Sequence, residues 1–193
     1  WILDEAYSGR STKDKLAAVR EKMKEKGAEV HLLASLYDIA WLLNVRGNDI
    51  SYVPVVLSYL ALTQEQCIWF LQEEVVDDTL REYLQKNGIT TRLYEAFYEY
   101  VKTLENQTIL LNRAVVNTKI CNNLPESAQM IDAEDPTLEM KAVKNETEIS
   151  NTRKAHVKDA VAMCRFMYWL KKNVGKIPMT EISASDYLES LRD

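Results

Sequence analysis

Glycine, proline and histidine are scarce in this sequence, which has five, four and two of them among its 193 residues. With so few glycines, a glycine-rich phosphate-binding loop is not expected, and no P-loop or G-x-G-x-x-G motif occurs. The G-x-S-x-G motif of serine hydrolases is also absent. His31 and His156 are far apart, and neither has another histidine or a carboxylate at a known ligand spacing. We therefore expect both histidines to be structural, and we assign no catalytic residue and no metal ligand.

Cysteine is also rare. Cys67, Cys121 and Cys164 are widely spaced, odd in number and without a C-x-x-C pair. We expect buried, reduced thiols, which are typical of a cytoplasmic protein. No apolar run approaches the roughly 18 residues of a membrane span, and no signal peptide is recognisable. These absences predict a cytoplasmic location and no membrane partner.

Basic residues are not in excess, because 24 Lys and Arg stand against 29 Asp and Glu, giving a net charge of -5 with the signs interspersed. Without a basic face, nucleic acid is not an expected partner. The 47% of hydrophobic residues can build a sizeable core, and the length predicts one domain plus an appendage. The chain starts at Trp1 and stops within a helical pattern, so we expect an excised fragment.

Strand and helix patterns alternate up to about residue 131, which predicts an α/β fold with a mixed sheet of about six strands flanked by helices. The short connection between the second and third strands implies an antiparallel hairpin. The expected strands are 30–34, 55–62, 67–71, 89–94, 108–111 and 129–131. The expected helices follow Ser11, start near Leu36, run from Val76 to Gly88, and cover 95–104 and 117–124.

Two pairs, Ser11 with Asp14 and Ser35 with Asp38, have the spacing of a capping box at a helix start. Gly27 is placed to end the first of these helices. Gly47 is placed to take the positive φ that a sharp exit from the second needs.

A polar linker, Asp132–Pro136, follows the last expected strand, and only helical patterns come after it. Its acidic residues Asp132, Glu134 and Asp135 could bind a cation, but a solvated linker is the better interpretation. Helices are expected over 146–173 and 180–192, as the opening layer of a second domain. We therefore place one domain at 1–134 and another, truncated, at 135–193. Apolar residues cover much of both helices, which predicts a homodimer formed through them.

The loop that joins the helix near Leu36 to the next strand carries the best candidate site residues, Arg46 and Asp49. A guanidinium beside Gly47 can make a planar, two-pronged contact to a carboxylate. The alternative is structural: Arg46 pairs with Asp49 or Asp38 and fixes the loop.

Two separated motifs resemble a known family. Residues 38–50, Asp-Ile-Ala-Trp-Leu-Leu-Asn-Val-Arg-Gly-Asn-Asp-Ile, followed by Tyr-Val-Pro-Val at 52–55 and Ser-Tyr at 58–59, resemble the creatinase-type N-terminal domain of Xaa-Pro aminopeptidases. Asp-Pro-Thr-Leu-Glu-Met-Lys-Ala-Val-Lys-Asn at 135–145 and the segment 153–164 resemble that family's passage into its catalytic domain. The resemblance extends from about Ser11 to the end of the chain.

The resemblance implies a ribonuclease-H-like N-terminal domain followed by the first helices of a catalytic domain. The parent enzyme would remove the N-terminal residue before proline with two divalent metals, typically manganese, whose ligands lie beyond the point that corresponds to Asp193. The present domain would restrict access to the active site and take part in subunit contacts. Through Arg46 and Asp49 it would contact proline-containing peptides. By itself it should be inert and hold no cofactor.

Two alternatives stay open. The same scaffold occurs without its metal site in histone chaperones, where it binds protein, so the chain could be a catalytically silent interaction module. The parent could also be a prolidase or a creatinase, which differ from the aminopeptidases in substrate. The sequence of the missing C-terminal half would distinguish the peptidase from the interaction module, because only the peptidase has metal ligands there.

Overall fold

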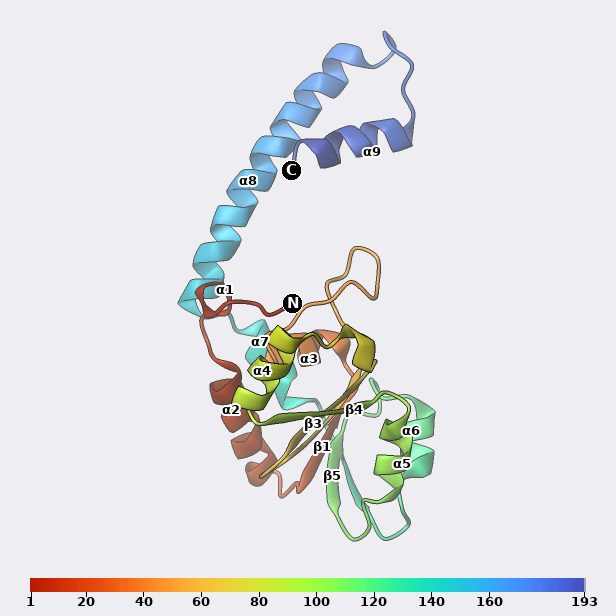
Figure 1. Ribbon diagram of the computed structural model, residues 1–193. Coiled ribbons are helices and arrows are strands. Elements are labelled where there is room, and N and C mark those ends of the chain that lie inside the picture. The colour runs from red at the N-terminus through yellow and green to blue at the C-terminus, as the bar shows by residue number, and fades with distance from the viewer. Residues whose placement is uncertain (193) are drawn as a thin grey trace. The chain divides into compact units, whose positions relative to one another are not determined.

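A computed structural model describes residues 1–192 of the chain. By packing, the chain divides into two compact units, Trp1–Lys144 and the part from Asn145 onward. Each unit is described separately below (Figure 1).

The first unit is built on a six-stranded mixed sheet with the strand order β4-β3-β2-β1-β5-β6. β2 is antiparallel to both β1 and β3, whereas β4, β5 and β6 are added in parallel at the two sides. The predicted mixed sheet of six strands is confirmed, and so is the hairpin of β2 and β3. The strands are β1 Val30–Leu33, β2 Tyr59–Thr63, β3 Cys67–Leu71, β4 Ile89–Leu93, β5 Thr108–Leu111 and β6 Gln129–Asp132.

Helices cover both faces of this sheet (Figure 1). The helices of the first unit are α1 Glu5–Ser8, α2 Thr12–Glu25, α3 Leu36–Leu42, α4 Asp78–Lys86, α5 Ala96–Lys102, α6 Thr118–Asn123 and α7 Pro136–Ala142, with a 3-10 turn, η1, at Glu73–Val75. The sequence did not predict α1 or α7. Both are short, and α7 begins with a proline, which is well suited to the first position of a helix.

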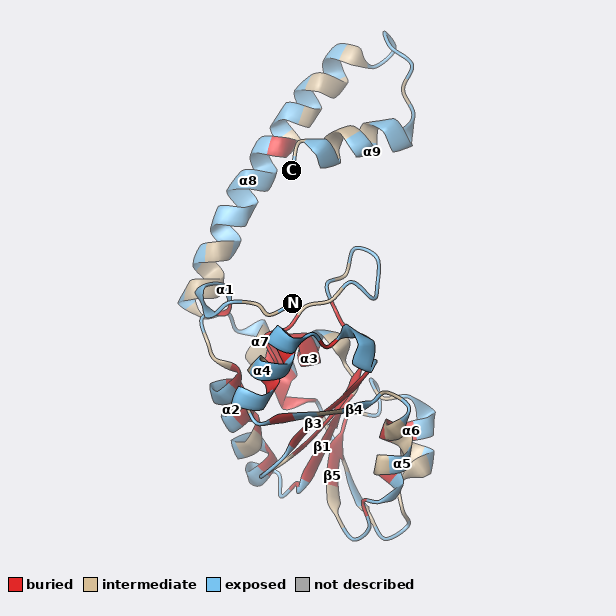
Figure 2. Cartoon of the chain, in the orientation of Figure 1, coloured by how far each residue is buried: buried red, intermediate tan, exposed pale blue. Residues whose placement is uncertain are grey.

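Successive side chains of a strand point to opposite faces of the sheet, so the first unit has two separate hydrophobic cores, one on each face. In β2, Leu60 and Leu62 pack with side chains of α2, α3 and α4, whereas Tyr59 and Ala61 pack with those of α5 and α6. The central strands are buried along their whole length, in contrast to the exposed helix surfaces (Figure 2). A sheet covered on both faces explains why these strands read as continuous apolar runs in the sequence.

The strand predicted over 55–62 begins later, at Tyr59. Residues 55–58 lie outside the sheet, and there Asp49 Oδ2 accepts the Leu57 N–H at 2.7 Å. The apolar run at 55–62 therefore combines the end of a loop, in which Leu57 is exposed, with a buried strand.

Helix termini follow the predictions in part. Ser11 caps α2 by accepting the Asp14 N–H, and Gly27 takes a φ of 69° after that helix, as expected. The capping box predicted at Ser35 is wrong, because the Ser35 side chain makes no capping hydrogen bond. The positive φ predicted for Gly47 is also wrong, since Asn44 takes it, with a φ of 51°.

The second unit consists of α8, Glu146–Asn173, and α9, Glu181–Ser190, which confirms both predicted helices. Each starts with a complete capping box, from Asn145 with Glu148 and from Thr180 with Ser183. The two helices contact each other where the Trp169 and Tyr187 rings lie 4.2 Å apart. Within residues 1–192, no helix combines the length and apolar character that a membrane crossing requires.

Candidate functional site

The candidate loop, residues 43–58, joins α3 to β2 and is anchored at its start by the N-terminal segment of the chain. The Leu3 N–H donates to the Asn44 carbonyl oxygen at 2.7 Å, and the Arg46 N–H donates to the Trp1 carbonyl oxygen at 2.8 Å. Ile2 and Val45 form an isolated antiparallel bridge between these contacts. The backbone around Arg46 is therefore fixed on both sides before the loop leaves the core.

The Arg46 guanidinium turns back onto α3. Its Nη1 donates to the Ala40 carbonyl oxygen at 2.9 Å and to the Val45 carbonyl oxygen at 2.8 Å. A cation at these carbonyls compensates the negative end of the helix dipole. Burial lowers the pKa of Arg46 from its usual value, but an arginine stays charged at neutral pH.

The pairing of Arg46 with Asp49 or Asp38, expected as the structural alternative, is wrong: the ion pairs among residues 1–192 do not include Arg46. Asp49 instead accepts the Leu57 N–H, and Asp38 lies against Lys141. Arg46 and Asp49 are thus held separately, each by backbone groups. In the described part of the chain, Nε and Nη2 of Arg46 have no hydrogen-bond partner, so one edge of the fork stays open to a ligand.

Lys15 supports this loop from α2, a role that sequence reasoning missed. Its side chain is only 1% exposed, and its Nζ donates to the Trp41 carbonyl oxygen at 2.8 Å and to Asn44 Oδ1 at 2.7 Å. A signal existed, because Lys15 lies at helical spacing with the buried Val19 and so falls on the core face of α2.

Gly47 is needed for close packing. A Cβ at this position would lie 2.6 Å from Val56 Cγ2 and 2.8 Å from the Val55 carbonyl oxygen. Farther along, the Val53 N–H donates to the Ile50 carbonyl oxygen and closes a turn at the loop tip. Tyr52 in that turn has a φ of 66° and is 99% exposed. The loop therefore has a rigid base and a protruding aromatic tip.

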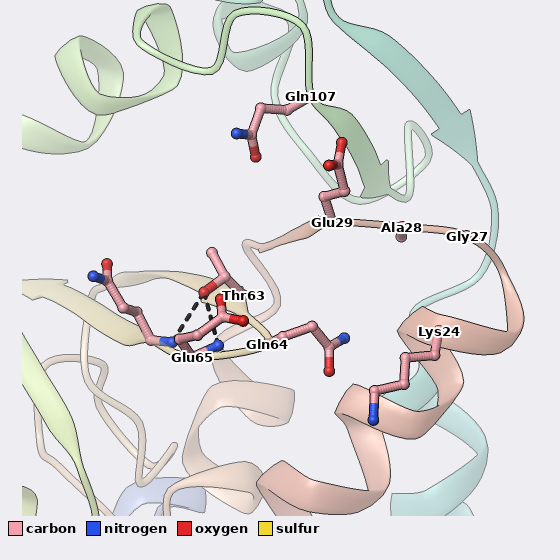
Figure 3. A pocket seen from close by; sticks show the side chains of 9 residues that line it. Lys24, Gly27, Ala28, Glu29, Thr63, Gln64, Glu65 and Gln107 are labelled. Atoms are coloured by element: carbon pink, nitrogen blue, oxygen red, sulfur yellow. Dashed lines mark hydrogen bonds between the residues drawn. The ribbon is translucent and has the colours of Figure 1, made fainter.

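A hollow of about 550 Å³ lies at the end of β2 that is opposite to this loop (Figure 3). It is bordered by Lys24 of α2, Glu29 before β1, the turn between β2 and β3, and Gln107 before β5. The Glu29 carboxylate accepts the Thr108 N–H at 2.8 Å, and Lys24 pairs with Glu21. Two of its charged groups are thus used within the protein, the third, Glu65, lies in the exposed turn, and we assign no activity to this hollow.

The acidic linker is not solvated as expected. Asp132 and Glu134 are exposed, but Asp135 is only 5% exposed and lies 3.9 Å from Nε2 of the buried His31. The expectation failed because α7 follows Asp135 directly and packs against α2 and α3, which encloses the carboxyl group. The structural role predicted for His31 agrees with its full burial within β1.

The described residues do not fit a metal centre. Among residues 1–192, no three side chains of His, Cys, Asp or Glu come together in a way that could hold a metal ion. All three cysteines are free, but only Cys67 is buried. The expectation of three buried thiols is therefore wrong for the partly exposed Cys121 and for Cys164, which lies on the surface of α8.

The six-stranded domain and its loop lie within the part of the chain that matches a known protein family. A family model described as the creatinase/prolidase N-terminal domain matches residues 1–148. The chain belongs to this family, as its motifs predicted.

The chain is also similar in sequence to proteins named as Xaa-Pro aminopeptidases. The chain is 36% identical to a probable Xaa-Pro aminopeptidase P of Laccaria bicolor, over 98% of this chain and 30% of that protein. It is 32% identical to Xaa-Pro aminopeptidase 1 of Dictyostelium discoideum, over 100% of this chain and 31% of that protein. The chain thus spans about a third of the length of these relatives.

Solved structures agree on the fold. The X-prolyl aminopeptidase of Caenorhabditis elegans, described as a cytosolic enzyme with a di-nuclear active site, matches with a TM-score of 0.90 and 27% identity, over 99% of this chain and 32% of that one. An Xaa-Pro dipeptidase from Bacillus anthracis matches with a TM-score of 0.65 and 16% identity, over 94% of this chain and 49% of that one. The second likeness shows the fold alone.

Proposed function

We propose that this chain is the non-catalytic N-terminal domain, with the first helices of the catalytic domain, of a metal-dependent Xaa-Pro aminopeptidase. The observation that carries the proposal is the match of 99% of the chain, including α8 and α9, to an X-prolyl aminopeptidase with a TM-score of 0.90. The parent protein would remove the residue that precedes proline. Its catalytic domain would begin in the sequence at residue 135, although α7 packs within the first unit, Trp1–Lys144.

The parent enzyme would use two divalent metals, which we propose to be manganese. A di-nuclear active site is described for the matching structure of Caenorhabditis elegans. Because residues 1–192 contain no group of side chains that could hold a metal, the ligands would come from the part of the parent that follows. The role of the present domain would be to limit access to that centre, in the cytoplasm, where the matching enzyme is described to act.

Within that role, the loop at 43–58 would contact the peptide substrate. Three features support this: the open edge of the Arg46 guanidinium, the rigid base that Lys15 and Gly47 give the loop, and the exposed tip at Tyr52. A guanidinium edge with two N–H groups can bind a peptide carboxylate or carbonyl group. Asp49 would act indirectly, by holding the returning strand of the loop through the Leu57 N–H.

The test of this contact is Arg46→Ala in the full-length parent. If Arg46 binds substrate, kcat/KM for an Xaa-Pro peptide should fall about tenfold or more, because a charge-assisted hydrogen bond contributes about 1.5 to 3 kcal/mol. Arg113→Ala, which removes an exposed guanidinium from the same domain, is the matched control and should leave kcat/KM unchanged. An unchanged kcat/KM for Arg46→Ala, with a lower melting temperature, would leave Arg46 only its role at the end of α3.

We also propose that the fragment forms a homodimer through its C-terminal helices. In α8, Ala162 is the only buried residue among those described, whereas Val157, Val161 and Tyr168 are more than half exposed. An apolar surface of this kind is normally covered in a soluble assembly. Light scattering at micromolar concentration should report a dimer for residues 1–193 and a monomer for residues 1–145, and a strictly monomeric 193-residue chain would contradict the proposal.

Two other functions remain as alternatives: a protein-interaction module without metal ligands, and a prolidase. The higher TM-score and identity of the aminopeptidase match favour the aminopeptidase over the prolidase. A parent that binds no divalent metal would instead support the interaction module.

A further inference from the structure

A buried polar cluster joins three separate segments of the first unit. His31 lies in β1, Asp38 in α3, and Asp135 and Thr137 at the start of α7, and each of these residues is at most 5% exposed. In the described structure, His31 Nε2, Asp135 Oδ1 and Thr137 Oγ1 have no hydrogen-bond partner. A buried polar atom without a partner is costly, so several in one place call for an explanation.

The tautomer of His31 follows from its other nitrogen. His31 Nδ1 lies 3.1 Å from the Leu110 carbonyl oxygen, which can only accept a hydrogen bond. Nδ1 must therefore carry the proton in the neutral ring, and Nε2 is left as an acceptor. Nε2 faces Asp135 Oδ1 at 3.9 Å. If Asp135 were ionised, two acceptors would face each other in a site closed to bulk water.

The surrounding charges also oppose an ionised Asp135. Asp38 of α3 acts on both His31 and Asp135, and the one cation facing this cluster in the described structure, Lys141 of α7, lies 2.8 Å from Asp38 Oδ1. Burial, with a smaller contribution from Asp38, raises the pKa of Asp135 to about 7, while burial lowers the pKa of His31 to about 4. On the outer side, Lys22 of α2 and Glu139 of α7 interact with each other, and the linker residues Asp132 and Glu134 are exposed.

We propose that Asp135 carries a proton at mildly acidic pH and donates it to Nε2 of His31, so that one buried proton fastens the start of α7 to β1. The separation of 3.9 Å closes to hydrogen-bond length by a side-chain shift of about 1 Å. The proton thereby holds the segment that leads from the sheet into the second unit. This inference does not depend on the proposed peptidase function.

The pair has a distinctive effect on the pH dependence of folding. Asp135 has a raised pKa, so its contribution to stability is full below 3.8 and is lost as the pH rises to about 7. His31 has a lowered pKa, so its contribution is present above 6.5 and is lost as the pH falls to about 4. Between pH 4 and 6.5 the folded pair holds one proton on Asp135 and the unfolded pair holds one on His31. The two slopes therefore cancel in the wild type.

Single variants separate the two slopes. We measure the folding equilibrium constant by denaturant titration from pH 4 to 6.5 and express each variant relative to the wild type. Asp135→Asn leaves only the histidine, so its relative constant should rise with pH by up to about tenfold per unit. His31→Asn keeps a donor for the Leu110 carbonyl oxygen and leaves only the carboxyl, so its relative constant should fall by a similar factor per unit. Glu134→Gln, at the exposed neighbour of Asp135, should run parallel to the wild type.

A second measurement does not require the variants to be equally stable. The infrared spectrum of the 193-residue chain at pH 6 should contain the carbonyl band of a protonated carboxylic acid. This band should persist in Glu134→Gln and be missing in Asp135→Asn. A wild-type spectrum without the band at pH 6 would overturn the proposal, and so would an Asp135→Asn variant whose stability runs parallel to that of the wild type over this pH range.

Discussion

The ammonium group of Lys141 lies 2.8 Å from Oδ1 of Asp38, and this ion pair joins α7 to the first turn of α3. The side chain of Asp38 is 4% exposed and that of Lys141 is 26% exposed. A residue expected to cap its own helix thus serves instead as a contact for a helix about a hundred positions away in the sequence. The pair makes α7 part of the first unit, although the acidic linker precedes it.

Lys141→Met should lower the free energy of unfolding of the first unit by about 1 to 3 kcal/mol. Removing one partner of a fully buried ion pair costs about 3 to 5 kcal/mol, because it leaves the other charge unpaired. The partial exposure of Lys141 reduces that cost. Denaturant unfolding of the two proteins at pH 7 measures the difference.

Lys22→Met is the control for this substitution, since it breaks an exposed pair with Glu25 whose side chains are 48% and 61% exposed. Its effect should be small, because solvent screens an exposed ion pair. Equal effects of the two substitutions would show that the Lys141 pair adds nothing beyond a surface interaction.

Gly47→Ala should destabilise the protein by about 1 to 3 kcal/mol, as expected for overpacking. The added methyl group would lie 2.8 Å from the Val55 carbonyl oxygen, a backbone atom that can move only with the loop. Gly88→Ala is a useful comparison, because it has open space around the new methyl group and only a φ of 69° to oppose it. Hydrogen exchange should show faster exchange at residues 48–58 in Gly47→Ala alone, and unchanged exchange there would refute the close-packing role.

The three thiols should differ in reactivity towards iodoacetamide. Burial raises the pKa of Cys67 to about 12, and the side chain is inaccessible in β3. Cys164 is exposed on α8, so at pH 8 it should be alkylated first, with Cys121 slower and Cys67 protected until the protein unfolds. Peptide mass analysis over time gives the order. Early modification of Cys67 would mean that the first unit opens readily.

The six strands and the two long helices of the second unit could be predicted from the sequence because their signals are local. In β1, β2 and β3 a continuous apolar run marks a strand covered on both faces, and in the helices a capping residue is followed by spaced apolar residues. Arg46 and Asp49 were placed correctly on one loop for the same reason. What each of them binds could not be predicted, because their partners are backbone groups fixed by the path of the loop.

The features that the sequence did not reveal depend on contacts between distant segments. Asp135 reads as a solvated residue in an acidic linker, and its burial follows only from the packing of α7 against α2 and α3. In the sequence His31 is an isolated histidine, and only the fold brings it close to Asp135 at the start of α7. Lysine is usually a surface residue, and only the position of Lys15 among the apolar residues of α2 indicates that it is buried.

The most direct test of the proposed function is an assay of the full-length parent and of the 193-residue chain, with manganese, on a peptide whose second residue is proline. The account predicts that the parent releases the first residue and that the 193-residue chain, which lacks a metal-binding group among its described residues, releases none. A parent that is inactive with bound metal, or that cleaves only Xaa-Pro dipeptides, would contradict the proposed aminopeptidase function, and hydrolysis by the 193-residue chain would contradict its non-catalytic role.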